Sequence, residues 1–171
     1  MGNIRSPKVA NDILERGDAD FIGIGRGLIA DPDWVNKAEF GEECDIRKCI
    51  SCNIGCAGNR IQNNRPIRCT VNPAVIEGEE YKKLKVNKPC NVVVVGGGTA
   101  GMEAAFVAKK RGHNVVLCEA KEELGGALHV ACVPIAKQEL TKVVQFLAHR
   151  LYTSGVDVRL NTPVTKEMLE G

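Results

Sequence analysis

The sequence lacks the features that would assign a protein to a membrane or to nucleic acid. Its uninterrupted apolar runs, such as residues 92–95, fall far short of the ~20 residues that cross a bilayer. The formal net charge is only +2, so charge predicts no general attraction to nucleic acid or to a membrane surface. The first residues lack the charged start, apolar middle and small-residue cleavage site of a signal peptide. We therefore expect a cytoplasmic protein without a nucleic-acid or membrane partner.

Histidine is scarce, and the sequence has neither an internal repeat nor a low-complexity segment. The three histidines lie far apart without the spacing of metal ligands, so we expect surface or packing positions for His113, His129 and His149. Cysteine is abundant by comparison, with eight in 171 residues. Their uneven spacing does not suit a small disulfide scaffold. In a reducing compartment, close-set cysteines more often bind metal or carry out redox chemistry than form bridges.

Two predicted segments precede the apolar run at residues 92–95. Residues 1–40 begin with a helix signal at Ser6-Pro7, where serine can cap the helix and proline is tolerated in its first turn. A short apolar strand is predicted at residues 21–24, running into Gly25-Arg26-Gly27, and this single strand has no local partner. Residues 41–88 carry a cluster of cysteines and show little periodicity, so we expect this segment to have a poor core of its own.

The third predicted segment, residues 89–171, alternates strands and helices. The apolar run "NVVVV" indicates a buried strand, "GGGTAG" indicates a glycine turn, and the helix that follows is stopped by Gly112. This alternation predicts an α/β fold with a parallel, doubly wound sheet. The predicted strands are residues 91–95, 114–119 and 155–160, and the predicted helices are residues 102–111 and 137–152.

Four cysteines follow the pattern C-x2-C-x3-C-x12-C, and they are Cys49, Cys52, Cys56 and Cys69. The short gaps allow one loop to surround a compact inorganic centre on three sides, while the distant fourth thiolate closes the cage from another segment. A [4Fe-4S] cluster requires four thiolates around a cube, whereas structural zinc more often takes two separated pairs of ligands. We therefore predict that these cysteines bind a [4Fe-4S] cluster. Zinc binding and four free thiols are the alternatives.

Two glycines lie within the cysteine pattern. We expect Gly55 and Gly58 to let the backbone pass close to the cluster sulfurs, where amide donors would raise the reduction potential. The other four cysteines are not assigned as ligands. Cys44 lies just before the pattern, and we expect Cys90, Cys118 and Cys132 to be packing thiols because their sequence surroundings are apolar.

A dinucleotide-binding fingerprint, G-x-G-x-x-G, lies between the first predicted strand and helix of the third segment. Gly96 permits the tight turn, Gly98 lets the backbone approach a pyrophosphate, and Gly101 allows the helix to pack closely on the strand. The helix N-terminus would offer free amides to the phosphates. Glu119 ends the next strand at about the required ~20-residue separation, so we expect its carboxylate to accept hydrogen bonds from an adenosine ribose.

Several stretches, taken in order, resemble the iron-sulfur flavoenzymes related to old yellow enzyme, the group that includes 2,4-dienoyl-CoA reductase and trimethylamine dehydrogenase. They are "GNIRSP" and "ADFIGIGRGLIADPDW", then the cysteine run with "CTVNPA", then "VVVVGGGTAGMEAA" and "LGGALHVACVPIAKQEL". The resemblance implies that residues 1–40 are the end of an FMN-binding TIM barrel. It implies that residues 41–88 ligate a [4Fe-4S] cluster and that residues 89–171 open an FAD-binding domain, which is incomplete here.

The resemblance also implies cofactor contacts. Gly25 and Arg26 would contact the FMN phosphate through the last barrel strand, where such sites are common. Matching positions imply an FAD site formed with Ala100, Glu119, Gly125, Gly126, Ala127, Lys137 and Val164. Because about six barrel strands would precede Met1, the substrate pocket would lie outside this sequence, and we assign no catalytic residue.

The function implied by the resemblance is that of a relay within a larger enzyme. Electrons would pass from NAD(P)H through FAD and the [4Fe-4S] cluster to FMN and a small-molecule substrate such as an enoyl thioester. We expect the chain to be the electron-transfer section and to be inactive by itself, and a homo-oligomer is left open. The alternative is a zinc-stabilised interaction module with a nucleotide-binding fold and no redox role.

Overall fold

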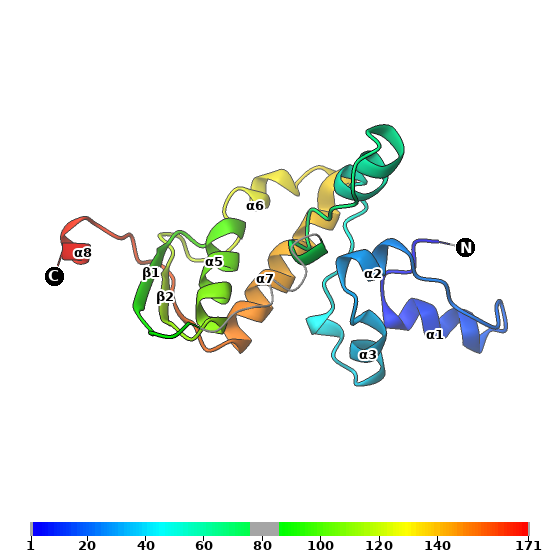
Figure 1. Ribbon diagram of the computed structural model, residues 1–171, viewed down its shortest axis with the longest axis horizontal. Helices are drawn as coiled ribbons and strands as arrows, with labels where there is room; N and C mark the ends of the chain where they lie inside the picture. Colours follow the sequence, from blue (N-terminus) through cyan, green and yellow to red (C-terminus); the bar gives the residue numbers. More distant parts are fainter. Residues whose placement is uncertain (1, 76–85, 171) are drawn as a thin grey trace. The chain divides into compact units, whose positions relative to one another are not determined.

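The computed structural model describes residues 2–75 and 86–170 and divides into two compact units, Met1–Lys82 and Lys83–Gly171 (Figure 1). Within those described ranges, no helix has the length and apolar character needed to cross a membrane. The predicted division into three segments places a boundary near residue 40, inside the first unit, and stays a prediction.

The first unit is mostly helical. Helix α1 begins where the sequence predicts, because the Val9 backbone N–H donates to the Ser6 hydroxyl (3.4 Å) and Pro7 occupies the first turn. A small core forms around Ala10, Trp34 and Ile46, so residues before position 40 pack against the start of the cysteine-rich segment within this unit. Its elements are α1 (Pro7–Glu15), α2 (Arg26–Ala30), α3 (Trp34–Glu39), the 3-10 helix η1 (Glu43–Asp45) and the π-helix η2 (Ile54–Gln62).

The strand predicted at residues 21–24 is wrong, because the structure has no strand there. A strand needs a hydrogen-bonded neighbour. The described residues of the first unit contain no second strand to pair with it. Ile22 and Ile24 still pack against the small core, whereas Phe21 is 83% exposed. The stretch thus contributes two apolar side chains to the core without the backbone hydrogen bonding of a strand.

The second unit contains a three-stranded parallel sheet in the order β1-β2-β3, which confirms the α/β fold class. In register, Val93 pairs with Val116, and Leu117 pairs with Val158. The helix predicted at residues 137–152 is divided, because its first part is a 3-10 helix. The elements are β1 (Asn91–Val95), α5 (Thr99–Lys110), β2 (Asn114–Cys118), α6 (Leu128–Ala131), η3 (Ile135–Leu140), α7 (Thr141–Thr153), β3 (Asp157–Arg159) and α8 (Glu167–Glu170).

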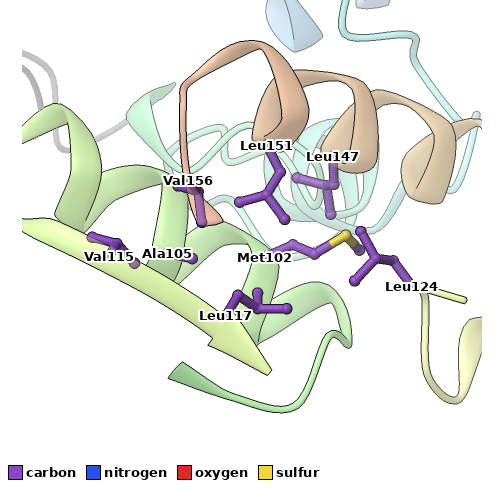
Figure 2. Packing of buried hydrophobic residues seen from close by; sticks show 8 residues of the cluster. All are labelled: Met102, Ala105, Val115, Leu117, Leu124, Leu147, Leu151 and Val156. Carbon is purple, nitrogen blue, oxygen red and sulfur yellow. The ribbon is translucent and has the colours of Figure 1, made fainter. Parts of the chain in front are cut away.

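The core of the second unit lies between the sheet and the helices α5 and α7 (Figure 2). Met102 on α5 is fully buried between Leu117 of β2 and Leu151 of α7. The other buried members of the cluster are Ala105, Val115, Leu124, Leu147 and Val156. The expectation of a fully buried first strand is wrong for one of its faces, since Val93 and Val95 are 50% and 59% exposed. Both helices that bury the core cover the other face.

Candidate metal centre and flavin-binding loops

All four cysteines of the predicted ligand set line one cavity in the first unit. The walls of this open cavity come from α2, from the loop before η2, from η2 itself and from residues 69–71. The four cysteines are not paired in disulfides. Residues 2–75 and 86–170 contain no group of three histidine, cysteine or acidic side chains that could hold a metal ion, so the cysteines share the cavity without converging on a point. Cys44 is exposed and does not line the cavity.

Gly55 brings the third and fourth cysteines together. The Arg68 backbone N–H donates to the Gly55 carbonyl oxygen (2.7 Å). A β-carbon at Gly55 would lie 2.6 Å from the Arg68 carbonyl oxygen, which is closer than atoms approach in folded proteins. Only glycine therefore lets the start of η2, which carries Cys56, lie against the backbone that carries Cys69. We predicted that Gly55 lets the backbone pass close to the cluster sulfurs, whereas in the structure the group that lies close to Gly55 is the Arg68 backbone.

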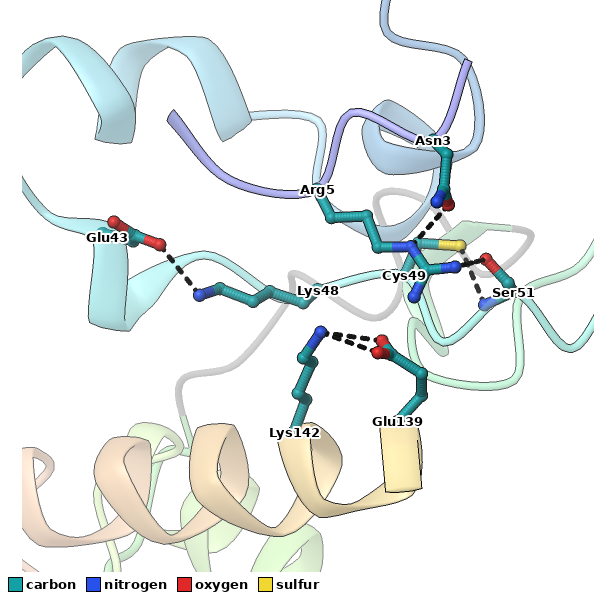
Figure 3. A network of polar contacts seen from close by, with 8 residues as sticks. All are labelled: Asn3, Arg5, Glu43, Lys48, Cys49, Ser51, Glu139 and Lys142. Carbon is teal, nitrogen blue, oxygen red and sulfur yellow. Dashed lines mark hydrogen bonds and ion pairs between the residues drawn. The ribbon is translucent and has the colours of Figure 1, made fainter. Parts of the chain in front are cut away.

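Hydrogen bonds fix the sulfurs of two cysteines. The Ser51 backbone N–H donates to the Cys49 sulfur (3.4 Å), as Figure 3 shows. Cys52 and the Thr70 hydroxyl share a hydrogen bond of 3.2 Å, which ties the cysteine loop to the residue after Cys69. Burial, with a smaller contribution from the Cys49 and Cys52 thiols, raises the pKa of the Cys69 thiol. A bound metal centre would instead hold this thiol deprotonated.

A buried polar network supports this cavity, and no motif in the sequence marks its residues. Asp31, which is 4% exposed, accepts hydrogen bonds from the Lys37 ammonium (2.7 Å) and from the Arg47 backbone N–H (2.8 Å). Asn72, which is 3% exposed, accepts from the Arg47 guanidinium (2.8 Å) and donates to the Ile29 carbonyl oxygen (3.0 Å). These residues flank the cysteine pattern on both sides, so the network holds the two ends of the loop. The sequence alone does not identify these residues, because their hydrogen-bond partners are determined by the folded structure.

The glycine turn after β1 has the conformation that the fingerprint predicts. Gly96 has a φ of +100°, a conformation that favours glycine. A β-carbon at Gly101 would lie 1.9 Å from the Gly96 carbonyl oxygen, so α5 packs directly on the turn. At Gly98, no atom lies within 4 Å of the position of a β-carbon. The backbone at Gly98 is thus open to an approaching ligand, whereas Gly101 is closed by the protein.

A second glycine pair packs against the first. The Gly125 backbone N–H donates to the Gly97 carbonyl oxygen (2.9 Å), and Gly98 and Gly125 form an isolated parallel bridge. A β-carbon at Gly126 would lie 3.1 Å from the Gly98 Cα. The structure therefore brings together the two glycine loops that the resemblance assigned to one FAD site. Ala127 follows directly.

The remaining positions predicted for the FAD site are spread over the second unit. Ala100 and Ala127 are exposed beside the two glycine loops, Lys137 is exposed on η3, and Val164 is half-buried after β3. The roles of these four residues toward FAD stay predictions.

Glu119 already has partners in the protein. Its carboxylate accepts hydrogen bonds from the Lys121 backbone N–H (2.9 Å) and from the Gly97 backbone N–H (2.6 Å). The bonds to Lys121 and then to Gly97 hold the pKa of Glu119 below its ordinary value. The carboxylate is thus ionised at neutral pH and tethers the glycine turn, and its role toward a ribose stays a prediction.

This depressed pKa predicts an acid sensitivity of the second unit. A carboxyl group with a lower pKa in the folded state stabilises the fold above its unfolded pKa of about 4.5, and that stabilisation is lost as pH falls through the folded pKa. A Glu119→Gln variant should be less stable at neutral pH by about 1–3 kcal/mol, because its amide cannot accept both hydrogen bonds. Its stability should also fall less steeply below pH 4.5. Urea unfolding followed by circular dichroism at neutral and acid pH checks both, and equal acid slopes for the two proteins would contradict the assignment.

Gly25 and Arg26, the residues predicted to contact the FMN phosphate, lie at the start of α2. The Arg26 guanidinium donates to the Asn53 side-chain oxygen, and Arg26 and Asn53 both line the cysteine cavity. The structure thus connects Arg26 to the loop of the predicted cluster, a link that sequence spacing gave no means to find. Its role toward a phosphate stays a prediction.

Family models match both units. Residues 1–45 match the model described as the NADH:flavin oxidoreductase / NADH oxidase family, and residues 91–167 match the model described as FAD dependent oxidoreductase. The cysteine pattern lies between the two matches.

Individual relatives match along nearly the whole chain. The chain is 48% identical over 172 residues to an NADH oxidase from Thermoanaerobacter brockii and 42% identical over 171 residues to a bilirubin reductase from Mediterraneibacter gnavus, in each case over 99% of this chain and 26% of the relative. Among solved structures, a 2-naphthoyl-CoA reductase in complex with 2-naphthoyl-CoA is similar with a TM-score of 0.92 at 28% identity, over 98% of this chain and 26% of that one. The chain thus spans about a quarter of the length of these relatives.

Proposed function

Because the chain belongs to the NADH:flavin oxidoreductase family of flavin-dependent oxidoreductases, we propose that it is the electron-transfer section of a larger enzyme of that family. In this proposal, electrons pass from NAD(P)H through FAD and a [4Fe-4S] cluster to FMN and a small-molecule substrate. The solved 2-naphthoyl-CoA reductase is in complex with a thioester of coenzyme A, which supports an enoyl thioester as that substrate. When bound, the cluster exchanges single electrons, whereas the flavins exchange one or two.

The cysteine residues Cys49, Cys52, Cys56 and Cys69 would hold the [4Fe-4S] cluster. The observation that carries the proposal is that all four line one cavity, although they come from three places: a loop, a π-helix and a later segment. A [4Fe-4S] cluster takes one thiolate at each of its four iron atoms, which suits four thiols spread around a cavity, whereas a single zinc ion would need all four sulfurs about 2.3 Å from one point. π-Helical turns are also frequent at functional sites.

The second unit would hold FAD at the two packed glycine loops. The open backbone at Gly98 lets a pyrophosphate approach the N-terminus of α5, whose free N–H groups favour an anion. Glu119 keeps the Gly97 loop in place through its hydrogen bond. Arg26 and Gly25 would hold the FMN phosphate at the other end of the chain, and Arg26 would do so while bound to Asn53 of the cluster loop.

Reductive titration of the anaerobically purified chain tests the proposal. We expect a broad visible absorbance that is bleached by one electron equivalent of dithionite per chain, with the appearance of an electron paramagnetic resonance signal. An absorbance that dithionite leaves unchanged, or a protein without visible absorbance after reconstitution with iron and sulfide, would rule out the electron-transfer role.

A further inference from the structure

We propose that Arg5 is a positioning residue for the cysteine cavity, and that through Ser51 it raises the reduction potential of the centre bound there. The inference rests on the proposed function, since it concerns a cluster held by Cys49 and its partners. Arg5 lies outside the cysteine pattern and outside every cofactor contact that the resemblance implies.

The Arg5 guanidinium lies between two side chains of the first unit (Figure 3). Its Nε donates to the Asn3 side-chain oxygen (2.6 Å), and its Nη2 donates to the Ser51 hydroxyl (2.9 Å). Ser51 in turn donates its backbone N–H to the Cys49 sulfur (3.4 Å). Ser51 thus connects a permanent positive charge, through its hydroxyl, with a sulfur of the predicted ligand set, through its backbone N–H.

The backbone at Ser51 explains why such an anchor is needed. Ser51 has a φ of +54° and Asn53 a φ of +57°, in the left-handed region, which is unfavourable for a residue other than glycine. These two residues flank Cys52, and an arginine holds each of them by its side chain: Arg5 holds Ser51, and Arg26 holds Asn53. Both arginines precede the cysteine pattern in the sequence, so side chains from outside the pattern shape the loop that carries Cys52.

The consequence for a bound cluster follows from charge. One-electron reduction adds one negative charge to the centre, and both an N–H donor at a ligand sulfur and a nearby cation favour the more negative state. Arg5 contributes to both effects, because it fixes the Ser51 amide and brings its own charge to the loop. Removing Arg5 should therefore make the centre harder to reduce without removing a ligand.

The experiment measures the midpoint potential of the centre in the full chain by anaerobic dithionite titration, with iron and sulfide content determined on the same samples. Arg5→Gln should lower the midpoint potential. At the potential where the unmodified protein is half reduced, the ratio of oxidised to reduced centre should rise from one to about ten, which corresponds to a decrease of ~59 mV for a one-electron couple. Arg5→Lys, which keeps the charge, should recover part of the shift. Arg16→Gln is the matched control, since Arg16 in the same unit pairs with exposed Asp18 and should leave the potential unchanged.

An Arg5→Gln protein with full iron content and the unmodified potential would overturn the inference. If Arg5→Gln loses iron, Ser51→Ala decides in the same way, because it removes only the hydroxyl that Arg5 holds and leaves the backbone N–H in place. Absence of iron and sulfide from the unmodified chain would instead contradict the proposed function. The two failures are thus distinguishable.

Discussion

Replacing Cys69 by serine is expected to abolish the iron-sulfur centre. Cys69 is the only cysteine of the pattern that comes from the later segment, so no neighbouring thiol in the loop can take its place. A cluster is bound by thiolates. A serine hydroxyl is a much weaker acid than a thiol, so it does not supply an equivalent ligand. We expect Cys69→Ser to lose the visible absorbance and most of its iron.

Cys44→Ser is the matched control for this prediction. Cys44 lies five residues before Cys49 and outside the cavity, in the same unit of the structure. Its replacement should leave iron content and absorbance unchanged. Full iron content in Cys69→Ser, or equal losses in the two variants, would show that the pattern C-x2-C-x3-C-x12-C does not define the ligand set.

Replacing Gly101 by alanine should destabilise the second unit more than a glycine-to-alanine substitution at any other position of the glycine turn. The new β-carbon would lie 1.9 Å from the Gly96 carbonyl oxygen. That oxygen is a backbone atom and the position of a β-carbon is fixed by its own backbone, so no side-chain rotation can relieve the clash. Helix α5 would have to shift off β1, and overpacking of this kind costs about 3 kcal/mol. For a unit of this size, the unfolding temperature should fall by roughly 15 °C, as measured by calorimetry of the full chain.

Gly98→Ala separates the fold from ligand binding at the same turn. Gly98 has a φ of −70°, which alanine adopts readily, and no atom lies within 4 Å of the new methyl group. The unfolding temperature should therefore stay close to that of the unmodified chain. The methyl group would stand where a pyrophosphate approaches the backbone, so affinity for FAD should fall at least about tenfold, or ~1.4 kcal/mol. Unchanged quenching of FAD fluorescence would show that FAD does not bind at Gly98.

The parts of the fold that follow from local sequence were predicted well. An apolar run, a glycine turn and a helical stripe suffice for β1 and α5, and Ser6-Pro7 suffices for the start of α1. The strand predicted at residues 21–24 failed because strand pairing is a non-local property. The same limit applied to the sheet face that carries Val93, since an all-valine run does not reveal which of its sides a helix covers.

Sequence patterns located the cysteine cavity and the glycine turn, but not the side chains that support them. Cysteine spacing pointed to the set that the cavity gathers, and the fingerprint pointed to the turn that Gly96 and Gly101 form. The hydrogen bonds from Arg5 to Ser51 and from Arg26 to Asn53 join residues distant in sequence. No periodicity or motif marks such pairs, because their side chains meet only after the first unit has folded.

Iron and acid-labile sulfide per chain, determined on anaerobically purified protein alongside zinc, test the central claim most directly. A [4Fe-4S] centre held by the four cysteines of the cavity predicts about four irons and four sulfides per chain, with little zinc. One zinc per chain without sulfide would contradict it and would assign the same cysteines to a structural metal site.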